Sequence, residues 1–126
     1  MIISPHTWRN IFKPRYAWQF ELAHSLNLLV YFHCCGNFLE IIHDFIEIGV
    51  DIINISQPIL YRIPELGDRF GAKVCFTCPV SYQTISISGS RTDNFKDAQI
   101  LVEHLGCFNG GLNGWVEEYH SMSMAT

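Results

Sequence analysis

The sequence of 126 residues predicts one α/β domain with about four parallel strands and flanking helices. Three segments repeat one order of features: an apolar strand, a polar turn and a helix, closed by Gly49, Gly71 and Gly106. Strands that alternate with helices through short returns form parallel sheets with right-handed crossovers. No G-x-G-x-x-G follows a strand, so the dinucleotide-binding open sheet lacks support. The other common architecture is the (β/α)₈ barrel, of which four strands are about half.

The elements follow from local patterns along the chain. A helix is expected over residues 5–26, with Trp8, Phe12, Tyr16 and Phe20 as core residues at four-residue steps, and Pro14 should kink or split it. A nearly continuous apolar run over 28–35 predicts a strand buried on both faces. An amphipathic helix is expected over 38–48, with Asp44 on its solvent side. The later elements are strands at 50–56, 73–78 and within 111–116, a helical segment ending near Gly71, a long polar connection, and a helix over 94–105.

Composition excludes several classes of function. Eight Lys and Arg against twelve Asp and Glu give a net charge of −4, and no basic run occurs, so a nucleic-acid partner is not expected. No stretch reaches the roughly 20 apolar residues that cross a bilayer, and the first residues lack the layout of a secretory signal. An odd count of five cysteines in such a chain indicates reduced thiols. We therefore expect a cytoplasmic protein.

A half-barrel raises the question of what covers its edges. Two edge strands and an inner layer would be exposed, and both promote aggregation. We expect residues 1–126 to be a partial domain that is truncated at its N-terminus, because a helix begins almost at Met1 with no strand before it. The alternative is a homodimer in which two copies pair through the exposed strand edges.

Metal-ligating side chains occur where the predicted strands end, which is the edge at which parallel barrels carry their active sites. His33 and Cys35 are two residues apart on a strand, so both point to one face and could bind one Zn²⁺ ion. The alternative is a buried strand end in which His33 is hydrogen-bonded and Cys35 packs as a small apolar residue. Cys78, at the end of the third strand, is a possible third metal ligand, whereas Cys75 is expected in the core.

Further candidates lie in the loops after the strands. His120 follows the last strand and could be an acid–base group or a ligand, or else an exposed residue of the tail. Of the adjacent Glu117 and Glu118, at most one should face the site, since neighbours on an extended chain diverge. Gln83 is a further catalytic candidate. The side chains expected to contact a small-molecule substrate are Asn37, Asn54, Gln57 and Tyr82.

The run YFHCCGNFLEIIHDFIEIGVDIINISQP closely resembles the uroporphyrinogen decarboxylase superfamily. In the methyltransferase branch of that superfamily a strand ends in H-x-C-G, a helix follows, and G-V-D and N-x-x-Q-P come next. The lead-in SPHTWRNIFKPRY, the loop with Gln83 and the GG before the last strand extend the resemblance over nearly the whole chain. The resemblance implies the C-terminal half of a (β/α)₈ barrel, strands five to eight.

The methyltransferase branch implies a zinc site in which H-x-C and a later cysteine activate a thiol, such as coenzyme M or homocysteine. The thiol then attacks a methyl group carried by a corrinoid protein. His33 and Cys35 match the first two ligands, but no cysteine follows the last strand, so His120, Glu117 or Glu118 would have to be the third.

The decarboxylase branch, a lyase of porphyrin biosynthesis, is matched only at His120, because its arginine-rich motif and its aspartate have no counterpart here. Holding the carboxylates of a tetrapyrrole also needs cations, which are few near the expected site. We therefore expect zinc-dependent methyl transfer from a methylated corrinoid to a thiol. Uroporphyrinogen decarboxylation and an inactive half-barrel fragment are the alternatives.

Overall fold

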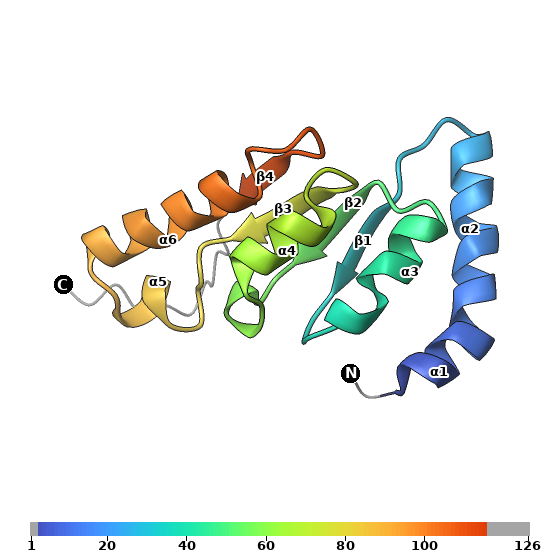
Figure 1. Cartoon of the computed structure of the whole chain (residues 1–126), viewed down its shortest axis with the longest axis horizontal. Coiled ribbons are helices and arrows are strands. Elements are labelled where there is room, and N and C mark those ends of the chain that lie inside the picture. Colours follow the sequence, from blue (N-terminus) through green and yellow to red (C-terminus); the bar gives the residue numbers. More distant parts are fainter. Residues whose placement is uncertain (1–2, 116–126) are drawn as a thin grey trace.

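The computed structural model describes residues 3–115 and contains a sheet of four strands, all parallel and in the order β1-β2-β3-β4 (Figure 1). The strands are β1 (Tyr31–Cys34), β2 (Ile52–Ile55), β3 (Cys75–Pro79) and β4 (Leu112–Trp115). Each strand therefore lies beside the one that precedes it in the sequence. The α/β class and the four parallel strands predicted from the sequence are confirmed.

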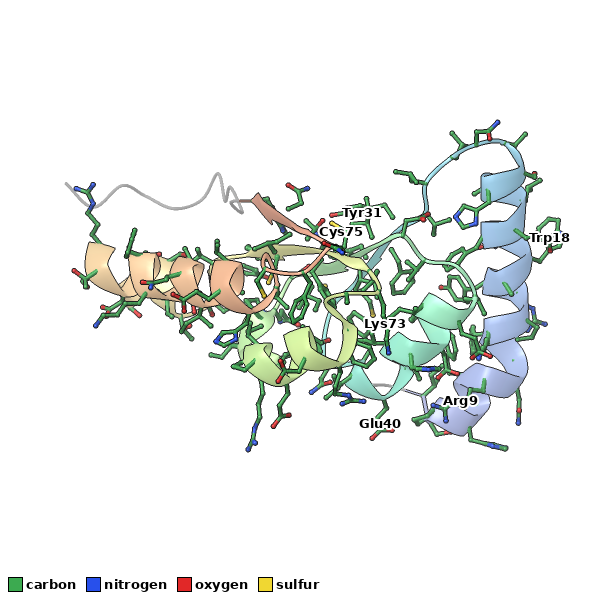
Figure 2. All side chains as sticks on the ribbon, turned by 45° about the horizontal axis from the view of Figure 1, so that its top comes forward. Arg9, Trp18, Tyr31, Glu40, Lys73 and Cys75 are labelled. Carbon is green, nitrogen blue, oxygen red and sulfur yellow. The ribbon has the colours of Figure 1, made fainter. Side chains whose placement is uncertain are left out.

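Helices connect the strands and lie over one face of the sheet (Figures 1 and 2). The N-terminal helical segment comprises α1 (Pro5–Thr7), a π-helix η1 (Trp8–Phe12) and α2 (Lys13–Ser25). The later helices are η2 (Leu39–Ile41), α3 (Ile42–Glu47), η3 (Pro58–Leu60), α4 (Ile63–Phe70), α5 (Ile85–Ser88) and α6 (Arg91–His104).

The first helix is divided just before Pro14, as expected: the π-helix η1 separates α1 from α2, and Pro14 occupies the first turn of α2, where its missing N–H is tolerated. One helix boundary differs from the sequence prediction for an identifiable reason. In α6 the start is earlier than expected, because Ser90 and Asp93 form a capping box that begins the helix at Arg91. The short α5 lies in the stretch that was expected to be an irregular connection.

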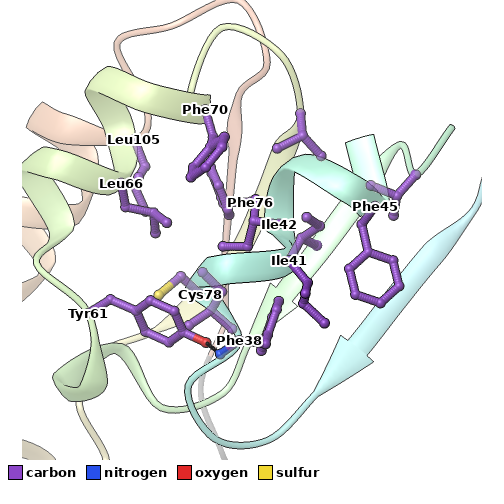
Figure 3. Packing of buried hydrophobic residues seen from close by; sticks show 14 of the residues in the cluster. Phe38, Ile41, Ile42, Phe45, Tyr61, Leu66, Phe70, Phe76, Cys78 and Leu105 are labelled. Atoms are coloured by element: carbon purple, nitrogen blue, oxygen red, sulfur yellow. Dashed lines mark hydrogen bonds between the residues drawn. The ribbon is translucent and has the colours of Figure 1, made fainter. Parts of the chain in front are cut away.

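The core lies between the sheet and the helices (Figure 3). Register places Phe32, Ile53 and Phe76 side by side on neighbouring strands, and Ile53 and Phe76 have no exposed surface. The ring of Phe45 on α3 packs on Phe32 with centroids 4.0 Å apart. Trp8, Tyr16 and Phe20 join this cluster as expected, whereas the side chain of Phe12 is 39% exposed.

One charged group in this layer was misplaced by the sequence pattern. Asp44 was expected on the solvent side of its helix, but it is buried because the N-terminal helical segment packs over α3. Arg9 donates to both carboxylate oxygens at 3.1 and 2.9 Å, and Lys13 donates to Oδ1 at 2.9 Å. Lys13 also pairs with Glu47 at 2.6 Å. The ion pairs therefore fasten the first helices to α3.

The other face of the sheet, which we call the His33 face, carries the alternate strand positions. They are Tyr31, His33, Ile52, Asn54, Cys75, Thr77 and Asn113. In Figure 2 the labelled side chains of Tyr31 and Cys75 lie on the side of the sheet away from the helices. No helix within residues 3–115 is both long and apolar enough to cross a membrane.

Candidate metal site on the His33 face

Three neighbouring strands contribute one row of polar side chains to the His33 face. Register pairs His33 with Asn54 and Asn54 with Thr77, so these residues lie side by side across β1, β2 and β3. Adjacent parallel strands are about 4.8 Å apart, which is within reach of a side-chain hydrogen bond. The row lies near the carboxyl ends of the strands, where the sequence placed the site.

Hydrogen bonds in this row fix the orientation of the His33 ring. His33 Nδ1 lies 2.8 Å from Asn54 Oδ1, and because an amide oxygen only accepts, Nδ1 carries the proton. Asn54 Nδ2 donates to the hydroxyl of Tyr31 at 2.6 Å, and Ser56 donates to Asn54 Oδ1 at 3.1 Å. Asn54 and Ser56 are both buried. His33 Nε2 therefore carries the lone pair of the ring and accepts a hydrogen bond from the Cys35 thiol, and it is the nitrogen that could bind a metal.

Cys35 presents its sulfur to that nitrogen. Cys35 Sγ lies 3.6 Å from His33 Nε2, which confirms that the two side chains point to the same face. Tetrahedral zinc with bonds of about 2.0–2.1 Å to nitrogen and about 2.3 Å to sulfur separates such a ligand pair by roughly 3.5–3.6 Å. The spacing of this S–H···N hydrogen bond is therefore also compatible with one shared zinc ion.

Cys78 does not belong to this site, contrary to the sequence prediction. It lies two residues after Phe76 on β3 and is buried, which places it on the helix side of the strand, within the hydrophobic cluster of Figure 3. Burial raises the pKa of its thiol to about 12. Cys75, which was expected in the core, lies instead on the His33 face and is half-buried. The sequence prediction had the two cysteines the wrong way round, because neither face of β3 carries a charged residue that would mark it as the side away from the helices.

The turn after β1 is held by side chains that the sequence marked for substrate. Gly36 N–H donates to Gln57 Oε1 at 2.8 Å. Asn37 donates through Nδ2 to the carbonyl of Leu60 and accepts from Leu39 N–H, both at 3.0 Å. These amides therefore fasten the turn that carries Cys35 to the segment after β2. Direct contact of Gln57 or Asn37 with substrate stays a prediction.

Tyr61 also holds this turn through hydrogen bonds, a role that the sequence analysis did not predict. Its hydroxyl donates to Gly36 O at 2.7 Å and accepts from Phe38 N–H at 3.1 Å. Burial raises the pKa of Tyr61, so its hydroxyl keeps its proton at all physiological pH values. Tyr31 was likewise missed, because an aromatic residue in an apolar run gives no sign that its hydroxyl supports Asn54.

The remaining candidates follow β3 and β4 in the sequence. Tyr82 and Gln83 lie in the turn after β3, with Tyr82 half-buried and Gln83 exposed. His120, Glu117 and Glu118 lie outside the described residues. Among residues 3–115, no three His, Cys, Asp or Glu side chains are grouped so that they could hold one metal ion. Within the described residues, His33 and Cys35 are therefore a pair of candidate metal ligands.

Comparisons of the chain with protein-family models, with curated proteins and with solved structures give no match. The geometry of the site and the residue pattern are thus the basis for a functional proposal.

Proposed function

We propose that this chain is the C-terminal half of a (β/α)₈ barrel that binds zinc through His33 and Cys35 and takes part in methyl transfer from a methylated corrinoid to a thiol. The observation that carries the proposal is the 3.6 Å separation of His33 Nε2 and Cys35 Sγ. The resemblance of the H-x-C-G and N-x-x-Q-P segments to corrinoid-dependent methyltransferases suggests the reaction.

Two features of the fold favour the barrel over an open doubly wound sheet. The strand order follows the sequence without reversal, whereas open sheets reverse at a switch point. The described helices lie on one face, as the outer ring of a barrel does (Figure 2). The His33 face would then be the barrel interior, and the rim with Cys35 would be its catalytic end.

The residues of this chain would divide the work as follows. Asn54 holds the proton on His33 Nδ1, so that Nε2 stays a ligand, and Cys35 supplies a soft sulfur ligand. Gln57 and Tyr61 hold the turn in which Cys35 sits. A bound zinc ion would supply Lewis acidity that keeps a substrate thiol ionised near neutral pH. Third-ligand candidates are His120, Glu117 and Glu118, which stay predictions.

The decarboxylase alternative finds less support in the described residues. The strand positions of the His33 face include no Lys or Arg that could hold the carboxylates of a tetrapyrrole. On the helix side, Arg9 and Lys13 are paired with Asp44. An arginine-rich partner segment would be needed for that reaction.

Metal titration of single variants tests the proposal. We expect about one zinc ion per chain in the wild type, and loss of binding in His33→Ala and in Cys35→Ala. The matched control is Cys34→Ala, because Cys34 is the adjacent cysteine but points to the helix side, where burial raises its pKa. Zinc affinity should change less than about twofold in this control. Equal losses in Cys34→Ala and Cys35→Ala, or no zinc in the folded wild type, would refute the proposal.

A further inference from the structure

A cavity of about 620 Å³ lies between the N-terminal helical segment, β1 and α3. Its lining includes the partly exposed rings of Phe12, Tyr16 and Phe32, and behind them the almost completely buried rings of Trp8, Phe38 and Phe45. Small-molecule sites have volumes of roughly 300–1,000 Å³ and are lined mostly by apolar and aromatic side chains. The cavity therefore has the size and the surface of a ligand site, and its rings could pack edge-on or offset against an aromatic ligand.

The lining of the cavity is without formal charge. None of its lining residues is Lys, Arg, His, Asp or Glu. The nearby cations Arg9 and Lys13 are engaged by Asp44. A charged group placed among the rings would lose hydration without gaining a partner of opposite charge. The cavity thus selects an uncharged ligand.

A rare backbone form shapes one wall. Trp8 and Phe12, the first and last residues of the π-helix η1, both line the cavity. Single π-helical turns are uncommon and occur frequently at functional sites, because the wider turn re-aims side chains at some cost in stability. The two residues are four positions apart, so their rings share one face of the helix and line the same cavity.

The cavity also reaches the candidate metal site. Cys35, whose sulfur stands 3.6 Å from His33 Nε2, is one of its lining residues, together with Gly36 and Asn37 of the following turn. Cys35 and Asn37 are exposed, so this end of the cavity opens at the rim of the sheet. A molecule in the cavity could therefore extend its end to the pair of metal ligands.

We propose that this cavity binds the uncharged, aromatic body of the acceptor thiol, whose sulfur lies at the His33–Cys35 pair. The inference rests on the proposed function for the role of the sulfur, and on the cavity alone for the aromatic body. It departs from small charged acceptors such as coenzyme M and homocysteine, for which the cavity offers no countercharge.

Calorimetric titration with a matched pair of probes tests the two parts separately. The probes are 2-(1-naphthyl)ethanethiol and 2-(1-naphthyl)ethanol, which differ only in the SH or OH group, with homocysteine as the charged thiol. We expect both naphthyl probes to bind with or without zinc. In the presence of zinc, and only then, the thiol should bind at least about tenfold more tightly than the alcohol, a difference of about 1.4 kcal/mol. Homocysteine should bind at least about tenfold more weakly than the naphthyl thiol.

Failure of the two ideas would look different. If neither naphthyl probe binds while zinc does, the cavity inference is overturned and the proposed metal site stands. If both naphthyl probes bind but zinc does not increase the affinity of the thiol, the placement of the sulfur is wrong, and the aromatic site in the cavity is upheld. Tighter binding of homocysteine than of the naphthyl thiol would overturn the selection for an uncharged body.

A variant pair locates the binding to the cavity. Phe12→Lys places a cation in the cavity wall. It should lower the affinity for 2-(1-naphthyl)ethanol by about tenfold, because binding would then have to strip water from the lysine ammonium group. Leu22→Lys is the control: Leu22 is a similarly exposed apolar residue on α2 that does not line the cavity. If both variants keep the circular dichroism of the wild type and lose the same affinity for 2-(1-naphthyl)ethanol, the ligand does not bind in this cavity.

Discussion

The buried carboxylate of Asp44 offers a test of how the N-terminal helical segment is attached. Its side chain is 8% exposed and accepts hydrogen bonds from Arg9 and Lys13. Asp44→Asn keeps the shape but removes the charge. Hydrogen bonds to charged groups contribute about 1.5–3 kcal/mol. The loss should lie toward the lower end of this range, because Lys13 keeps its ion pair with Glu47 and the Arg9 side chain can be hydrated instead. We expect the free energy of unfolding to fall by about 2 kcal/mol.

That loss can be measured by urea unfolding and by thermal melting. For a domain of this size about 2 kcal/mol corresponds to a fall in Tm of roughly 6–10 °C. Glu47→Gln is the matched control, because Glu47 binds the same lysine but is 58% exposed. Its effect should be below about 0.5 kcal/mol.

The pH dependence gives a second, independent check. Burial alone would raise the pKa of Asp44, but the hydrogen bonds and charges of Arg9 and Lys13 outweigh it and hold the pKa below its ordinary value. A carboxyl whose pKa is lowered by folding contributes stability above its unfolded pKa, near about 4, and loses it as the pH falls further. The difference between wild type and Asp44→Asn should therefore shrink below about pH 4. A constant difference from pH 7 to pH 3, or a loss no larger than that of Glu47→Gln, would refute the reasoning.

Two further predictions concern packing. Gly67→Ala would place a Cβ 1.9 Å from the carbonyl oxygen of His104, where α4 and α6 meet, so we expect a loss of about 2–3 kcal/mol by urea unfolding. Gly114→Ala is the control, because its added Cβ would have no atom within 4 Å, and its stability should change by no more than about 0.5 kcal/mol. Similar losses of stability in Gly67→Ala and Gly114→Ala would argue against a close contact between α4 and α6. Thr77→Val removes a buried hydroxyl without a hydrogen-bond partner, so thermal melting should show stability that is unchanged or up to about 1 kcal/mol higher. A marked loss would mean that the hydroxyl has a partner.

Local pattern was enough to predict the elements and one pair of site residues. Alternation along an extended chain requires positions 33 and 35 to share a face, and the contact between His33 and Cys35 follows from it. The same rule separates Cys75 from Cys78, but it does not say which of them faces the helices. That choice depends on register with β2, and the apolar residues on both sides of β3 leave it open in the sequence.

The sequence by itself determined the α/β class, the order of strands and helices, and the pairing of an imidazole with a sulfur at one strand end, because these depend on spacing over a few residues. Only the tertiary structure decided which side chains support that pair and what lies beside it. Asn54, Tyr61 and the ring-lined cavity next to Cys35 come from segments that are distant in sequence. Such contacts are set by the packing of whole elements, for which a linear pattern carries no signal.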